Sequence, residues 1–196
     1  MTQKNQPLLD ALLSRRSVPV SLLGAPGPDE SETELLLRIA GRIPDHGRLE
    51  PWRFVLMRGD ERIAAGERIA DLAVKRNGPM EPQDIEKERT RFSRAPLVVL
   101  VVSKPVEHPR IPEWEQFLSA GAAAMNLLYG AMALGYGASW ITGWYSDDPE
   151  GRRILGLADD ERIAGIVHVG SYDGEVPDRP RPDMAAKVSE YVSGDG

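Results

Sequence analysis

The sequence contains no cysteine among its 196 residues, which excludes a disulfide framework, a thiolate metal site and a thiol nucleophile. Its three histidines are far apart and lack the spacing that places two zinc ligands on one helix, so no metal site is predicted. Three further signatures are missing: the Gly-x-Ser-x-Gly nucleophile elbow, the Walker phosphate loop, and a Gly-x-Gly-x-x-Gly turn after the first strand. If the protein is an enzyme, these absences favour a bound cofactor as the carrier of the chemistry.

Positive charge is also in short supply, with 24 Lys and Arg against 30 Asp and Glu and a net charge of −6. Duplex nucleic-acid binding needs a basic footprint, so that class of function is excluded. The N-terminus is polar and has no apolar signal region, which favours a cytoplasmic protein. We expect a single domain over residues 1–196, with residues 1–6 and 185–196 as tails or dimer arms.

Charge is absent altogether from residues 116–146, a segment long enough to span a bilayer. The segment is rich in Gly and Ala, which contribute little to membrane insertion, and it carries Ser119, Asn126, Ser139 and Thr142. A membrane span is therefore less favoured than a helix that is buried on all sides in a large core or a subunit interface.

Hydrophobic periodicity predicts helices and strands that alternate along the chain. The expected helices are 7–14, 31–43, 61–74, 86–91, 113–134 and 148–156, and the expected strands are 52–57, 97–102, 138–142 and 163–169. Ser31 and Glu34 have the spacing of a capping box at the start of the second helix. Residues 75–94 form a charged excursion with no readable pattern. Strands separated by helices in one small chain predict an α/β or α+β sandwich.

Arg15-Arg16-Ser17 follows the first expected helix and has two interpretations. Arginines are favoured near the negative end of a helix dipole. Alternatively, forked guanidinium donors beside a hydroxyl suit a phosphate clamp. A second pair, Arg179 and Arg181, could close on the same phosphate, but the sequence does not show that the two sets meet.

Small residues flank two tryptophans in the run from Gly135 to Trp144. Backbone without side-chain cover can lie close to a flat ligand, although tight interface packing explains the composition equally well. The alternation of Trp52 and Phe54 with polar or smaller residues predicts core positions. His46 stands alone in a loop, where a histidine is more often a satisfied loop residue than a ligand.

In their order along the chain, five motifs resemble the FMN-dependent nitroreductase family, and the Pro-Asp-His…Pro-Trp version is similar to its compact YdjA-like group of NAD(P)H nitroreductases. The motifs are Arg15-Arg16-Ser17, Pro44 to Phe54, the Gly/Ala helix that ends at Gly135-Tyr136-Gly137, Leu155-Gly156-Leu157, and Val167 to Gly170 with Pro177 to Pro182. The resemblance covers about residues 7–184. It implies an α+β fold with a mixed sheet flanked by helices, and an intertwined homodimer with two FMN sites at its interface.

The resemblance also implies roles for individual residues. The FMN phosphate and ribityl chain would be held by Arg15, Arg16, Ser17 and Arg181, with Arg179 beside them. The same flavin would be approached by Arg42 and His46, and its ring would lie along Trp140, Ile141 and Thr142. The nicotinamide nucleotide would meet Arg89 and the run Gly130, Ala131, Met132, Ala133, Leu134 and Gly135.

The activity that the resemblance implies is a ping-pong oxidoreductase reaction. NADH or NADPH would reduce the flavin and leave, and a nitroaromatic or quinone-like acceptor would then take two electrons. No side chain is needed as a catalytic acid or base in the first half, and the backbone around Thr142-Gly143 would donate a hydrogen bond near flavin N5. Glu50 departs from the Gln or Arg of relatives, so its carboxylate either opposes the reduced flavin or points outward. The alternatives are a flavin-binding storage or regulatory protein without efficient turnover, or a specialised flavin reaction such as dehydrogenation, dehalogenation or flavin breakdown.

Overall fold

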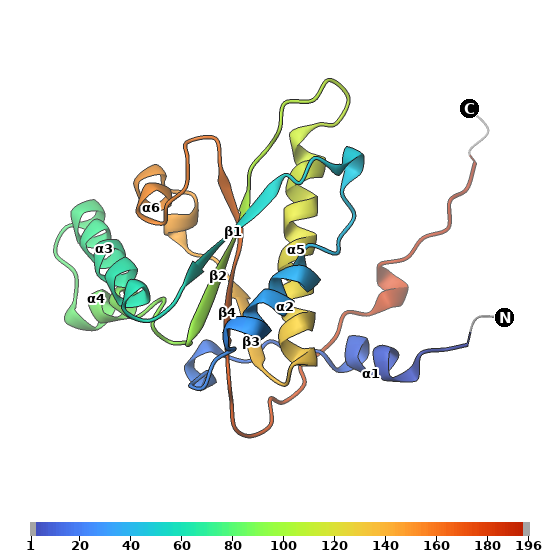
Figure 1. Cartoon of the computed structure of the whole chain (residues 1–196), viewed down its shortest axis with the longest axis horizontal. Helices are drawn as coiled ribbons and strands as arrows, with labels where there is room; N and C mark the ends of the chain where they lie inside the picture. The colour runs from blue at the N-terminus through green and yellow to red at the C-terminus, as the bar shows by residue number, and fades with distance from the viewer. Residues whose placement is uncertain (1–2, 194–196) are drawn as a thin grey trace.

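The computed structural model describes residues 3–193 and has one four-stranded sheet with helices on both faces (Figure 1). The strands are β1 (Trp52–Met57), β2 (Leu97–Ser103), β3 (Gly137–Ile141) and β4 (Arg162–Gly170), in the order β1-β2-β4-β3. All three pairings are antiparallel, so the expected mixed sheet is wrong within the described residues. The α+β class is confirmed, and β2, a continuous apolar run, is fully buried in the sheet interior.

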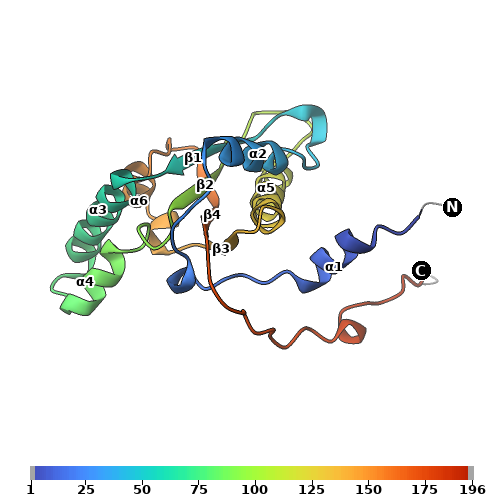
Figure 2. The same cartoon turned by 60° about the horizontal axis from the view of Figure 1, so that its bottom comes forward.

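The side-chain alternation of β2 divides the interior into two cores. Leu97, Val99 and Val101 pack beneath α2 (Glu30–Ala40) and α5 (Glu113–Ala133). Val98, Leu100 and Val102 face the opposite core, which is covered by α3 (Asp60–Asn77), α4 (Pro82–Arg89) and α6 (Pro149–Ile154) (Figures 1 and 2). Successive residues of a strand point to opposite faces, so one apolar run serves both cores.

The N-cap of α2 lies two residues earlier than predicted. It is Asp29, whose side chain accepts from the Glu32 backbone N–H at 2.8 Å while the Glu32 carboxylate accepts from the Asp29 N–H at 3.0 Å. The predicted capping box of Ser31 and Glu34 is therefore wrong. Asp29 and Glu32 have the same three-residue spacing, and the Ser31 hydroxyl instead donates to Asp29 at 2.8 Å.

The charged excursion is largely helical. Helix α3 continues to Asn77, and α4 occupies Pro82–Arg89 instead of the expected 86–91, with proline in its first turn. The two helices pack closely at Gly66, where an added Cβ would lie 1.9 Å from the Arg89 carbonyl oxygen. Glycine at this position is what permits that approach.

The uncharged segment forms α5, and its polar side chains are used to anchor loops. Ser119 Oγ donates to the Pro44 carbonyl at 2.8 Å, and Asn126 Nδ2 donates to the carbonyls of Ile39 (3.1 Å) and Arg42 (2.9 Å). Within residues 3–193, no helix combines the length and apolarity that crossing a membrane requires.

The core of the single chain does not bury α5 on all sides, so burial in a subunit interface stays a prediction. One side packs on the sheet and α2, whereas the other side is open, with Leu118 63% exposed. The helix ends as predicted at Gly135, which has φ +82° and forms a Schellman motif: the Tyr136 N–H donates to the Ala131 carbonyl at 2.9 Å. The same arrangement ends α6 at Gly156.

Both ends of the described chain extend from the same side of the body (Figures 1 and 2). They are α1 (Gln6–Ser14), which has no buried residue, and residues 171–193, here called the C-terminal arm, with a short 3-10 turn at Met184–Ala186. The other 3-10 turns are Val20–Leu22, His46–Arg48 and Trp144–Ser146. Of the expected tails, residues 1, 2 and 194–196 lie outside the described residues.

Candidate functional site

A groove of about 290 Å³ runs between the start of the chain, α5 and β3. We call it the β3 groove, and its lining residues are Arg15, Ser17, Met125, Leu128, Trp140, Ile141 and Thr142. Five of these residues were predicted to contact one flavin. The structure therefore brings together the Arg15–Ser17 segment and the Trp140–Thr142 segment, which are separated by more than half of the sequence.

The β3 side of the groove is a free sheet edge. β3 is the outermost strand, and on its outer side the Val18 N–H donates to the Ala138 carbonyl at 3.0 Å. Residues of an antiparallel strand alternate between the two edges, so Trp140 and Thr142 direct their backbone groups to the same side as Ala138. The groove thus contains backbone donors and acceptors in a row, beside a Trp140 indole that is 37% exposed.

Arg15 and Ser17 form the polar end of the groove. Arg15 caps the C-terminus of α1, and its Nη1 lies 3.5 Å from Ser17 Oγ. The two interpretations of this motif are compatible, because a guanidinium at the negative end of a helix can also reach an anion.

Arg16 points elsewhere and joins the C-terminal arm. Its Nε donates to the Pro177 carbonyl at 3.0 Å and lies 3.7 Å from Asp178 Oδ1, which also accepts from Arg181 Nη2 at 2.6 Å. The two arginine sets therefore do meet, through a carboxylate. We call Arg16 and Arg181 the arginine pair. The backbone N–H of Arg179 and the Arg181 side chain lower the pKa of Asp178.

Arg42 and His46 do not line the β3 groove of their own chain. His46 Nδ1 lies 2.8 Å from Glu115 Oε2 near the start of α5, in a second hollow of about 330 Å³. Glu115 and Met125 are ten residues apart, a rise of about 15 Å along the helix. The two hollows also lie on different flanks of α5, one beside Pro44 and the other beside Trp140.

Asp45 organises the loop around His46, a role that the sequence analysis missed. Its carboxylate accepts from the backbone N–H groups of Leu49 (3.1 Å) and Glu50 (2.8 Å). These bonds stabilise a turn in which Arg48 and Glu50 have positive φ. An aspartate ahead of a glycine-containing turn is a known signal for this arrangement. Glu50 itself is exposed, which agrees with the outward alternative.

The residues expected to meet the nicotinamide nucleotide are not together. Arg89 pairs with Glu67 and Glu86, both at 2.9 Å, on the α3–α4 side of the sheet. The run from Gly130 to Gly135 lies at the end of α5 on the other side, and it serves packing and capping. An added Cβ at Gly130 would lie 3.0 Å from Leu36.

Of the two backbone amides expected near flavin N5, one is engaged. The Gly143 N–H donates to Ser146 Oγ at 3.3 Å, which leaves Thr142 as the candidate donor. Glycine is needed at position 143 because an added Cβ would lie 2.5 Å from the buried ring of Tyr145. A Gly143→Val substitution would therefore disturb packing before it tested a flavin contact.

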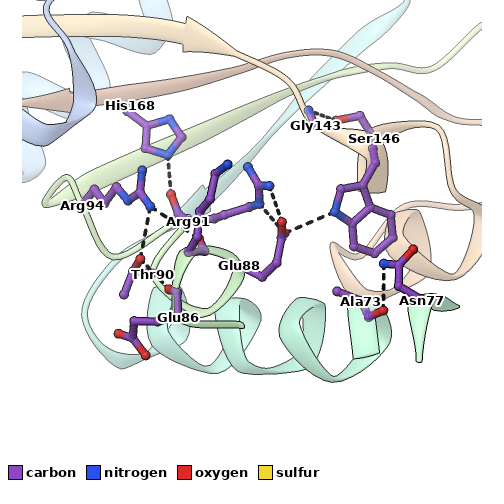
Figure 3. A network of polar contacts seen from close by, with 12 residues as sticks. Ala73, Asn77, Glu86, Glu88, Thr90, Arg91, Arg94, Gly143, Ser146 and His168 are labelled. Carbon is purple, nitrogen blue, oxygen red and sulfur yellow. Dashed lines mark hydrogen bonds and ion pairs between the residues drawn. The ribbon is translucent and has the colours of Figure 1, made fainter. Parts of the chain in front are cut away.

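On β4, the His168 side chain is fully buried. Burial lowers its pKa, and its Nε2 donates to the Arg91 carbonyl at 3.0 Å (Figure 3). Its Nδ1 and the Tyr145 hydroxyl are buried polar atoms without a hydrogen-bond partner among the described residues. Within residues 3–193, no cluster of His, Asp and Glu has a geometry suited to a metal ion.

The nitroreductase family model matches residues 12–171, which include all four strands and the last turn of α1. The chain belongs to the nitroreductase family. A relative in Escherichia coli K12, named "Putative NAD(P)H nitroreductase YdjA", is 34% identical over 163 residues, covering 83% of this chain and 87% of the relative. The family-model match ends at residue 171, ahead of Arg179 and Arg181.

Solved structures of nitroreductase-like proteins have the same fold. The nitroreductase-like family protein from Bacillus cereus superposes with a TM-score of 0.79 at 24% identity, covering 99% of this chain and all of that one. A nitroreductase with bound FMN from Bacteroides fragilis gives 0.70 at 20% identity, covering 97% of this chain and all of that one.

Proposed function

We propose that this nitroreductase-family chain is an FMN-dependent oxidoreductase. It would use NADH or NADPH to reduce nitroaromatic or quinone-like acceptors by two electrons. The observation that carries the proposal is the β3 groove, in which a guanidinium and a hydroxyl face the backbone donors of a free strand edge. The name of the E. coli relative and the FMN bound to the B. fragilis protein support it.

The residues of the groove fit FMN in their chemistry. Arg15 and Ser17 supply the fork and the hydroxyl that a phosphate group accepts from. At the other end, Trp140 offers an apolar face and the Thr142 edge offers an N–H and a carbonyl in line with the strand. A polar anion site beside a flat, half-apolar wall matches a phosphate attached to an isoalloxazine ring.

When bound, FMN supplies the two-electron chemistry between the nicotinamide and the acceptor. The chain's own residues hold and orient it. Arg15 neutralises phosphate charge, and the Thr142 N–H stabilises negative charge at the ring edge, where a fixed donor needs no reorganisation. We infer a ping-pong order, in which the nicotinamide would leave before the acceptor takes its place beside the flavin.

We further propose that a second copy of the chain completes each site. The open side of α5 continues into an apolar hollow of about 660 Å³ between α1, α2 and α5, where Leu12 is 45% exposed. A second α5 packed there would cover this surface. It would also bring Arg42 and His46 of one chain toward the β3 groove of the other, which a single chain does not do.

The test is anaerobic reduction of the purified protein. We expect stoichiometric FMN, rapid loss of flavin absorbance after NADH or NADPH is added, and recovery when a quinone or nitroaromatic follows. Bound FMN that is reduced slowly or not at all would favour the storage or regulatory alternative. A protein that binds no FMN would refute the proposal.

A further inference from the structure

Helix α4 contributes one residue to the interior, and that residue is a carboxylate. Glu88 is 7% exposed, whereas the rest of this short, highly charged helix is exposed or partly exposed. Burial of an ionised carboxylate is unfavourable unless specific partners compensate for the lost hydration. The partners of Glu88 therefore indicate why it is there.

Glu88 has two partners that come from different parts of the fold (Figure 3). Arg91 donates to both of its carboxylate oxygens through Nε and Nη2. The Trp144 indole N–H donates to Oε2 at 3.2 Å. Burial acts to raise the pKa of Glu88, but the bonds and charge of Arg91, with the Trp144 N–H, outweigh it and hold the pKa below its ordinary value. The Arg91 guanidinium already compensates the charge of the Glu88 carboxylate. The hydrogen bond from the Trp144 indole is therefore not needed for charge compensation, and it connects Glu88 to a second part of the fold.

Trp144 lies where the chain passes from one face of the sheet to the other. Trp140, before it, lies against Gly165 and lines the β3 groove. Tyr145, after it, is fully buried in the opposite core, with the Arg91 guanidinium 5.3 Å from its ring centre. Thr142 lies between Trp140 and Trp144 in the chain. Contacts that hold Trp144 and Tyr145 on the α4 side therefore fix the position of the Thr142 backbone at the edge of the β3 groove.

We propose that Glu88 is a positioning residue: by holding the Trp144 indole, it fixes the Thr142 backbone at the edge of the β3 groove. The inference rests on the proposed function, because the Thr142 edge is where the flavin ring is expected. An apolar residue at position 88 could fill the same space, but it would not orient an indole through its N–H.

Two variants separate positioning from packing. Trp144→Phe keeps an aromatic ring and removes the N–H, and Glu88→Gln keeps the shape and an acceptor while removing the charge. The matched control is Glu86→Gln, an exposed residue on the same helix that pairs with Arg89. For each variant, three properties are measured: the Kd of the apoprotein for FMN, the midpoint potential of the bound flavin, and the Tm of the apoprotein.

We expect Trp144→Phe to weaken FMN binding by about three- to tenfold, the effect of losing one hydrogen bond. The midpoint potential should become more negative, because a misplaced Thr142 N–H stabilises the reduced flavin less. Glu88→Gln should change both properties in the same direction. The double variant should show less than the product of the two single effects, since both remove one interaction. Glu86→Gln should match the wild type.

Two results would overturn the inference and leave the proposed function intact. In one, Trp144→Phe binds FMN with wild-type Kd and potential. In the other, the changes in Kd follow the changes in Tm across all variants while the potential stays constant, which identifies a purely structural bond. Failure of the wild-type apoprotein to bind FMN would be distinguishable, because it removes the proposed function together with this inference.

Discussion

Arg15→Ala is the most direct test of the β3 groove as a phosphate site. Within the described residues, the hydrogen bond of the Arg15 guanidinium is to Ser17 Oγ at 3.5 Å, so the fold loses little when it is removed. We expect the free energy of unfolding of the apoprotein to change by no more than about 0.5 kcal/mol, as for other surface substitutions. A charge-assisted hydrogen bond to phosphate contributes about 1.5–3 kcal/mol. FMN affinity should therefore fall by about one to two orders of magnitude.

The assay is a fluorescence titration of apoprotein with FMN and, in parallel, with riboflavin. Riboflavin lacks the phosphate, so Arg15→Ala should leave its affinity unchanged. Arg15→Lys should give an intermediate loss of FMN affinity, because lysine keeps the charge and lacks the fork. Arg153→Ala, which removes one positive charge on α6 beside Asp159, controls for net charge.

Two results would refute the assignment. If Arg15→Ala bound FMN as the wild type does, the phosphate would lie elsewhere, and the arginine pair would be the next candidate. If the affinities for FMN and riboflavin fell equally, Arg15 would act on the ring or on the fold and not on the phosphate.

Three further predictions follow from other contacts. Gly165→Ala places a Cβ 2.3 Å from Trp140 Nε1, so we expect a loss of about 1–3 kcal/mol in the free energy of unfolding, with weaker FMN binding and altered tryptophan emission. Glu161→Gln removes a buried carboxylate whose pKa is lowered by its hydrogen bonds with Arg53, at an expected loss of about 2 kcal/mol at neutral pH. The wild-type contribution is present above the unfolded pKa of about 4.3 and is lost as pH falls through the folded value, so Tm below that pH should fall less steeply in the variant. Asp178→Asn frees the arginine pair, which points away from the β3 groove, so we expect the Kd for FMN to stay within about twofold of the wild type; clearly tighter binding would place the phosphate at that pair instead of at Arg15.

The features that could be predicted are those decided by neighbours in the sequence. The apolar run of β2 is long enough to serve two cores, and the glycines at 135 and 156 stand where the helix patterns end. The start of α2 was predicted wrongly because the local sequence allows two N-caps. Two overlapping capping boxes fit the residues after Pro28, and local spacing does not choose between Asp29 and Ser31.

The candidate site was predictable in part. The contact between the Arg15 and Trp140 segments came from the family resemblance, because no local pattern brings together residues so far apart in the sequence. The role of Asp178 depends on where the C-terminal arm lies. Glu88 is on a helix whose charge predicts a solvent-exposed surface, and its burial depends on Arg91 and on Trp144, 56 residues further along the chain.

The free edge of β3 also matters for how the protein avoids aggregation. An uncovered strand edge is a template on which another chain can add a strand, and natural sheets usually protect it with charge, proline or a covering segment. Here the loop after α1 covers the edge at Ala138, while Trp140 and Thr142 open into the groove without a charged residue between them. A flat cofactor seated there would cover that remaining length. Binding of the cofactor would then serve two purposes. Besides its role in electron transfer under the proposed function, the cofactor would shield the strand edge of a newly made chain from pairing with other copies.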